Sequence, residues 1–166
     1  MRAIAWVVEQ GKRGVINMSL GGGKSTAFNN AISAAVDSGV TVVVAAGNEF
    51  QDACNVSPAS ATGAIAVGST DKDDKFSYFS NYGKCVDILA PGSSITSTWP
   101  RGATNTISGT SMASPHVAGE VADYLTDNPR ATPAQVKAFL LNNAVEGKIQ
   151  DVPKDTPNRL LHLECF

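Results

Sequence analysis

The sequence lacks an excess of either charge, a long apolar run and any internal repeat. It has 13 basic and 15 acidic residues, a net charge of −2 and a pI near 5.6. This balance argues against a nucleic-acid footprint or a strongly charged membrane surface. No apolar run approaches the length of a membrane span. Residues 1–10 begin with a basic residue but lack a long apolar core and a small-residue cleavage site, so they make a poor signal peptide.

The composition is that of a globular protein. Of the 166 residues, 43% are hydrophobic and 17% are charged. This length predicts one domain, which can bury about 70% of its unfolded surface.

Apolar periodicity predicts alternating strands and helices. Residues 40–46 are a continuous apolar, β-branched run, typical of a buried parallel strand. Residues 27–37 and 110–125 predict helices, and Thr132-Pro133 predicts the start of another that runs to residue 142. The pattern fades after Val145, where we expect a loosely held tail. Further short strands are expected at the following ranges: 14–20, 64–69 and 85–89. The alternation predicts an α/β fold with a mostly parallel sheet.

Residues 109–119, GTSMASPHVAG, are the most informative segment. Ser111 lies between a glycine turn and the first turn of the predicted helix, a position that exposes its hydroxyl beside free backbone N–H groups. Pro115 fits early in a helix, where a missing N–H costs little. The segment closely resembles the nucleophile motif of subtilisin-like serine proteases.

The resemblance covers roughly residues 3–145 and is to the proteinase K-like branch. It implies a three-layer subtilisin-like fold and a single partial peptidase domain over residues 1–166, with residues 146–166 a less certain tail. In this family the catalytic Asp and His precede all the matching motifs, so the resemblance implies an N-terminally truncated chain without them. The other segments that carry it are NMSLGGG at 17–23, VVVAAGN at 42–48, SPAS at 57–60, FSNYG at 79–83 and APG at 90–92.

The resemblance implies roles for two residues in catalysis. Ser111 would be the nucleophile, and Asn48, with the backbone N–H of Ser111, would stabilise the oxyanion. The alternatives are structural, since serine is a common helix N-cap and Asn48 follows a strand, where asparagine commonly forms turns.

By the same resemblance, two short segments would be the backbone walls around the substrate residue before the scissile bond. The alternative is tight packing of small residues. The apolar, permissive walls imply broad specificity. The walls are Ser19, Leu20 and Gly21 on one side and Ala45, Ala46 and Gly47 on the other.

The resemblance also implies a structural calcium ion, held by Asp87 and the carbonyls of Thr62 and Ala64. The alternative is a hydrogen-bonded structural Asp87. It further implies a Cys54–Cys85 disulfide, with two free thiols in a reducing cell as the alternative. Cys165 is left over. No organic cofactor is implied.

Other segments look like catalytic, phosphate-binding or metal-binding motifs, but each has a simpler structural interpretation. His116 lies five residues past Ser111, about 140° around the helix, so it cannot act as its base. Residues 37–39, DSG, form a helix-to-strand turn and not the catalytic Asp motif, and residues 23–25 lack the spacing of a phosphate loop. His116, Glu120 and Asp123 share a helix face, which we expect to be solvated in preference to a metal clip.

The resemblance therefore implies part of a secreted serine endopeptidase that acts on protein or peptide substrates. A vacuolar location is the alternative. The chain alone is expected to have little or no activity, and the alternative function is that of a non-catalytic peptide-binding remnant or pseudo-protease. The expected partners are a pro-segment or the missing N-terminal part, with no nucleic acid and no membrane.

Overall fold

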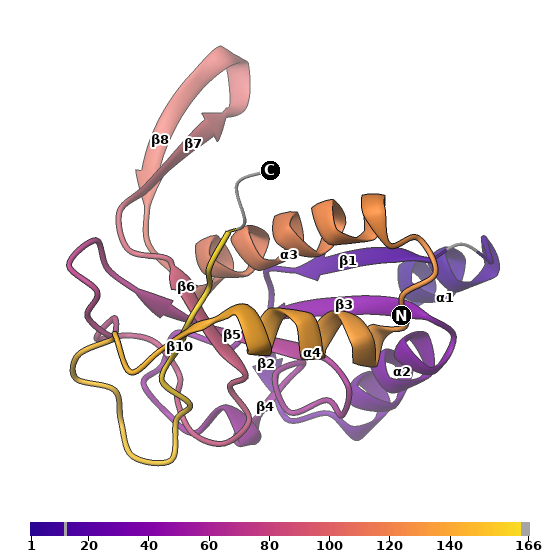
Figure 1. The fold of residues 1–166 in the computed structure, drawn as a ribbon, viewed down its shortest axis with the longest axis horizontal. Coiled ribbons are helices and arrows are strands. Elements are labelled where there is room, and N and C mark those ends of the chain that lie inside the picture. Colours follow the sequence, from indigo (N-terminus) through magenta and orange to yellow (C-terminus); the bar gives the residue numbers. More distant parts are fainter. Residues whose placement is uncertain (12, 164–166) are drawn as a thin grey trace.

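A twisted sheet forms the centre of the fold in the computed structural model, which describes residues 1–11 and 13–163 (Figure 1). The strand order is β1-β3-β5-β6-β10-β9, and every pair is parallel except β10 with β9. The strands of this sheet are β1 (Gly14–Met18), β3 (Val40–Ala45), β5 (Ile65–Thr70), β6 (Ile88–Pro91), β9 (Val145–Glu146) and β10 (Arg159–Leu160).

Helices cover both faces of the sheet, as expected for a three-layer α/β fold. One face carries α1 (Arg2–Glu9) and α2 (Thr26–Asp37), and the other carries α3 (Thr110–Asp127) and α4 (Pro133–Asn143). Strand β3 shows why both layers are needed. Val42 and Val44 pack in the core on the α2 side and Val43 in the core on the α3 side, so all of its residues are buried.

Local signals place the helix ends where the sequence predicts them. Ser25 caps α2 by accepting a hydrogen bond from the Phe28 N–H. Thr132 and Gln135 form a capping box at the start of α4. Gly39, at φ +94°, turns the chain from α2 into β3, which confirms the helix-to-strand turn at residues 37–39.

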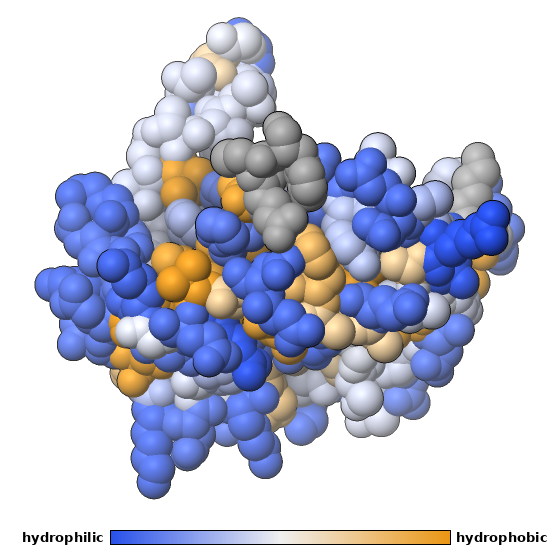
Figure 2. Space-filling model, viewed as in Figure 1, coloured by the Kyte–Doolittle hydropathy of each residue, from blue (hydrophilic) through white to orange (hydrophobic). Residues whose placement is uncertain are grey.

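Two small antiparallel pairs were not predicted. Strands β2 (Gly22–Gly23) and β4 (Val56–Ser57) join near the candidate site, and β7 (Ile95–Trp99) and β8 (Ala103–Ile107) form a hairpin that projects from the body (Figure 1). The hairpin is rich in Thr and Ser and appears pale in Figure 2, neither strongly hydrophobic nor hydrophilic. It has no apolar alternation, so periodicity gave no signal for it. The connecting 3-10 turns are Ala53–Asn55 and Pro100–Gly102.

The described part of the segment after Val145 is tied to the sheet, contrary to the loosely held tail that we expected. Leu161 N–H donates to the carbonyl of Leu89 in β6, and Ile149 is only 4% exposed. The side chain of Asn158 bonds both the N–H and the carbonyl of Ile149, at 3.1 and 2.7 Å. These are mostly backbone and single-residue contacts, which leave no periodic trace in a sequence.

The prediction that the helix face with His116, Glu120 and Asp123 is solvated is wrong at Glu120. Asp123 is exposed, but Glu120 is only 5% exposed, because it lies two turns from the buried Ala113 and next to the buried face of the helix. No cluster of three metal-ligating side chains occurs among the residues that the structure describes, so the alternative of a metal clip has no support there.

Two further expectations concern the cysteines and the membrane. Cys54 and Cys85 form a disulfide, as the resemblance implied, whereas Cys165 lies outside the described residues. Within the part of the chain that is described, no helix has both the length and the apolar character to cross a bilayer.

Candidate active site

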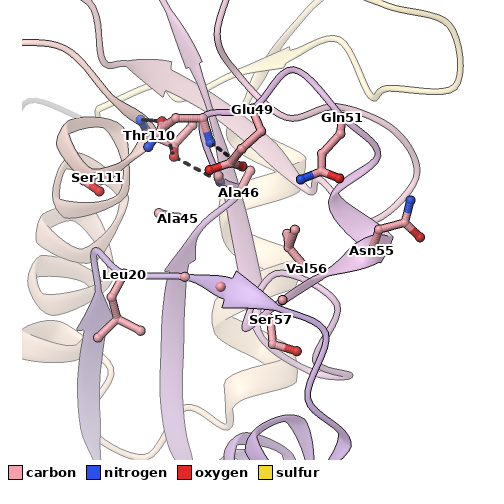
Figure 3. A pocket seen from close by; sticks show the side chains of 15 residues that line it. Leu20, Ala45, Ala46, Glu49, Gln51, Asn55, Val56, Ser57, Thr110 and Ser111 are labelled. Atoms are coloured by element: carbon pink, nitrogen blue, oxygen red, sulfur yellow. Dashed lines mark hydrogen bonds between the residues drawn. The ribbon is translucent and has the colours of Figure 1, made fainter.

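A pocket of about 370 Å³ opens at the carboxyl ends of β1 and β3, beside the start of α3 (Figure 3). Ser111 comes from the first turn of α3, Asn48 from the segment after β3, and Leu20 from the link between β1 and β2. Ligand sites commonly form at the carboxyl ends of strands in open α/β sheets. Every residue that the sequence predicted for catalysis or for the two walls lines this pocket except Ser19, which contacts Ser111 directly.

Asn48 is held in one orientation by the residue before Ser111. Its Oδ1 accepts hydrogen bonds from the backbone N–H of Thr110 at 2.8 Å and from the Thr110 hydroxyl at 2.9 Å. The hydroxyl oxygen of Thr110 in turn accepts from the N–H of Gly47 at 3.1 Å. The amide oxygen is thus occupied on the Thr110 side, and the Nδ2 group has no hydrogen-bond partner among residues 1–11 and 13–163. The geometry leaves this N–H₂ group available to a ligand.

Ser111 is half-buried at the N-terminal end of α3. Its hydroxyl donates weakly to the carbonyl of Ser19, at 3.3 Å. Its backbone N–H lies in the first helical turn, where no intrahelical acceptor exists. The site therefore presents a hydroxyl, a backbone N–H and the Asn48 amide, which together suit a carbonyl that gains negative charge.

Ser19 joins the end of β1 to α3. Its hydroxyl donates to the carbonyl of Ser111 at 2.8 Å, shares a hydrogen bond with the buried Ser114 hydroxyl at 3.0 Å, and accepts from the Asn17 side chain at 3.0 Å. These bonds fix the position of the first turn of α3 relative to residues 19–21.

Asn81 is fully buried and contacts the wall of the pocket that residues 45–47 form. Its Oδ1 accepts from the N–H groups of Glu49 and Gln51, at 3.1 and 3.0 Å. Its Nδ2 donates to the carbonyl of Ala46 at 2.9 Å and to the Glu49 carboxylate at 3.0 Å. Gly47 has φ +106°, and a Cβ there would collide with Asn81 Nδ2, so this position requires glycine.

Thr110, Asn81 and Glu49 are parts of the site for which the sequence analysis predicted no role. Thr110 and Asn81 lie inside motifs that carry the family resemblance, and this was the one signal available for them. Glu49 accepts from the Asn48 N–H at 3.0 Å and so completes the turn after β3.

His116 does not reach the serine. Its Nδ1 lies 2.8 Å from the carbonyl of Met112 in its own helix, in agreement with the helical rotation argument. The other histidine of the chain, His162, is exposed near the end of the described region. Across the described residues, no imidazole or carboxylate is hydrogen-bonded to the Ser111 hydroxyl.

The groups expected to bind calcium have other partners. Asp87 is hydrogen-bonded, which was the alternative interpretation, and its Oδ1 forms an ion pair with Lys137 Nζ at 2.7 Å. Lys137 also donates to the carbonyl of Ala64, and the Ser33 hydroxyl donates to the carbonyl of Thr62.

Comparison with known proteins places these features in a family. A model of the Subtilase family matches residues 1–162. The chain is 54% identical over 160 residues to the Subtilisin-like serine protease Pen ch 18 of Penicillium rubens, an alignment that covers 90% of this chain and 32% of that protein. It is also 54% identical over 160 residues to the Extracellular serine proteinase of Thermus sp. (strain Rt41A), covering 95% of this chain and 39% of that protein.

A solved structure shares this fold over nearly the whole chain. The crystal structure of a cold adapted subtilisin-like serine proteinase superimposes with a TM-score of 0.95 at 48% sequence identity, covering 99% of this chain and 60% of that one. This confirms the expected subtilisin-like fold. The chain spans about a third of the length of the two curated relatives and 60% of the solved chain.

Proposed function

Because the chain belongs to the subtilase family, we propose that it carries the nucleophile and the oxyanion site of a serine endopeptidase. Ser111 attacks the carbonyl carbon of a peptide bond, and the carbonyl oxygen becomes negatively charged as the tetrahedral intermediate forms. The amide of Asn48 and the backbone N–H of Ser111 stabilise that charge. The orientation of Asn48 by Thr110 is the observation that carries the proposal.

The two walls of the pocket bind the substrate as an extended strand. The exposed backbone of residues 19–21 pairs with the peptide, and the small side chains of residues 45–47 on the other side leave room for many substrate residues. The Glu49 carboxylate in the pocket accepts hydrogen bonds from the Asn48 N–H and the Asn81 side chain, which fix its position. Broad specificity for protein substrates follows from the small side chains.

The base is supplied from outside these 166 residues, and the chain alone has little or no activity. In a subtilisin, loss of the serine or of the histidine lowers turnover by about 10⁶-fold. Here neither histidine of the chain is bonded to Ser111. A His and an Asp from another segment would act as the base and its orienting carboxylate.

A second candidate function, binding of peptides without cleavage, is favoured by the state of the Ser111 hydroxyl. Its hydrogen-bond acceptor is the carbonyl of Ser19, which cannot deprotonate it. A chain with intact walls and no base would hold an extended peptide and release it unchanged.

The disulfide supports an oxidising location. Cys54 and Cys85 are joined in the structure, and such bonds persist mainly outside the reducing cytosol. We propose a secreted protein, with a vacuolar location as the alternative. We also propose that a pro-segment or the base-bearing segment is its partner.

Labelling and hydrolysis test the two functions together. The purified chain is treated with a fluorophosphonate and digested, and the modified residue is identified by mass spectrometry. We expect slow modification of Ser111 that disappears in Ser111→Ala and persists in Ser97→Ala, an exposed serine of the hairpin. Modification elsewhere, or equal labelling of Ser111→Ala, would exclude Ser111 as the nucleophile.

Hydrolysis of fluorescent casein by the same samples tests whether the chain alone has catalytic activity. We expect wild type and Ser111→Ala to give the same background rate. Turnover that depends on Ser111 would refute the proposal that the base is absent. Titration with a peptide, followed by backbone amide NMR signals of residues 19–21 and 45–47, reports peptide binding independently of cleavage.

A further inference from the structure

The groups expected to bind calcium surround the end of a lysine side chain. Asp87 lies between β5 and β6, Thr62 and Ala64 lie in the loop before β5, and Lys137 reaches them from α4. Lys137 Nζ is 2.7 Å from Asp87 Oδ1 and 3.0 Å from the carbonyl oxygen of Ala64. The ammonium thus bonds two of the three groups that calcium would need.

Each of the remaining oxygens accepts one hydrogen bond, so the Lys137 ammonium is the group that stands in the way of a metal ion. Asp87 Oδ2 accepts the backbone N–H of Ala66 at 2.9 Å, and the carbonyl of Thr62 accepts the Ser33 hydroxyl at 3.0 Å. Calcium requires six to eight oxygen ligands at about 2.3–2.6 Å, and an ammonium beside the same carboxylate repels it. The donor set present does not fit a calcium ion.

The charges of the surrounding side chains also disfavour a calcium ion at this position. The shallow pocket between the loop and α4 is lined by two lysines, Lys84 and Lys137, and by a single carboxylate, Asp87. Among these side chains the positive charge already exceeds the negative charge, and a divalent cation would increase the excess.

We propose that Lys137 is the built-in cation of this site and that the chain needs no calcium there. Val136 and Leu140 are buried on the inner face of α4, so the register of the helix directs the neighbouring Lys137 to the edge of the sheet. Its ammonium joins α4, the loop before β5 and the residue before β6, three segments that a metal ion would otherwise join.

Calcium titration tests the proposal in the unmodified chain. After dialysis against a chelator, isothermal titration calorimetry with CaCl₂ should show no binding heat that Asp87→Asn removes, and the melting temperature should be the same in CaCl₂ and in EDTA. A calcium site in the wild type that Asp87→Asn abolishes would overturn the proposal. Neither measurement depends on proteolytic activity, so the result is separate from the fate of the proposed function.

Removal of the lysine gives the complementary experiment. Lys137→Met should lower the melting temperature by about 2–4 °C in EDTA and should recover part of this loss in CaCl₂. Calorimetry should then show one calcium site, which the double variant Asp87→Asn/Lys137→Met lacks.

Lys84→Met is the matched control, because Lys84 lines the same pocket and has no ion pair among the described residues. It should have no effect on the melting temperature. A fall in Lys137→Met no larger than in Lys84→Met, or no calcium site in Lys137→Met, would refute the equivalence of ammonium and metal ion.

Discussion

Asn81 should be among the most sensitive polar positions of this chain. Replacing it with alanine should lower the free energy of unfolding by about 4 kcal/mol. The side chain is fully buried and makes four hydrogen bonds, to two backbone N–H groups, one carbonyl and one carboxylate. Each such bond contributes about 1 kcal/mol net, and the carbonyl of the buried Ala46 loses a hydrogen-bond donor. The alanine also leaves a cavity beneath Gly47.

This loss of unfolding free energy can be converted into a decrease in the melting temperature. Unfolding entropy near 60 °C is about 2.1 cal/mol/K per residue, or about 0.35 kcal/mol/K for 166 residues. A loss of 4 kcal/mol therefore lowers the melting temperature by about 11 °C. Urea and thermal unfolding followed by circular dichroism measure both quantities.

Asn30→Ala is the control for this prediction. Asn30 is exposed on α2 and has no side-chain hydrogen bond in the described structure, so the change should stay within about 0.5 kcal/mol. A loss below about 1 kcal/mol in Asn81→Ala would show that solvent replaces the four bonds. The argument that Asn81 rigidly supports the wall would then be wrong.

Three other substitutions test the site and the fold. Thr110→Val should weaken binding of a peptide aldehyde, measured by NMR titration, by about 10-fold, because the Asn48 amide loses one of its two anchors, worth about 1.4 kcal/mol. Cys54→Ser/Cys85→Ser should lose about 3–4 kcal/mol in urea unfolding, the loop-closure value for a separation of 31 residues. Ile149→Ala should lose about 2–4 kcal/mol, because the side chain is 4% exposed in the core.

Each of these has its own control. Thr110→Ser keeps the hydroxyl and should bind like the wild type. The double serine variant should unfold like the wild type under reducing conditions, and a difference there would point to strain from the serines. Val145→Ala, at a side chain that is 40% exposed, should cost less than about 1 kcal/mol. If Ile149→Ala costs no more than this, the segment after residue 145 is loosely held after all.

Much of the framework was determined by the sequence itself. The β-branched run of β3 can be stable only when buried on both faces, and this alone requires helices on both sides of the sheet. Thr132-Pro133 fixes the start of α4, and the rotation of an α-helix excludes His116 as a base. The motif around Ser111 is long enough to identify the family and to predict which serine is the nucleophile.

The hairpin and the segment after residue 145 escaped prediction for a common reason. Their strands are held by backbone hydrogen bonds and by a few isolated side chains, such as Ile149. Backbone groups are the same in every residue, so such contacts create no apolar period in the sequence. Glu120 was misjudged because it lies at the boundary between two faces of α3, where helical periodicity does not separate buried from exposed.

The partners of the polar side chains were decided by the tertiary structure alone. Asn48 meets Thr110 across 62 residues, Asn81 meets Ala46 across 35, and Lys137 meets Ala64 across 73. A hydrogen bond depends on distances of a few tenths of an ångström, and only the packing of the helices on the sheet sets those distances. The sequence predicted a nucleophile at Ser111, and the fold determined which neighbour orients the Asn48 amide and which cation faces Asp87.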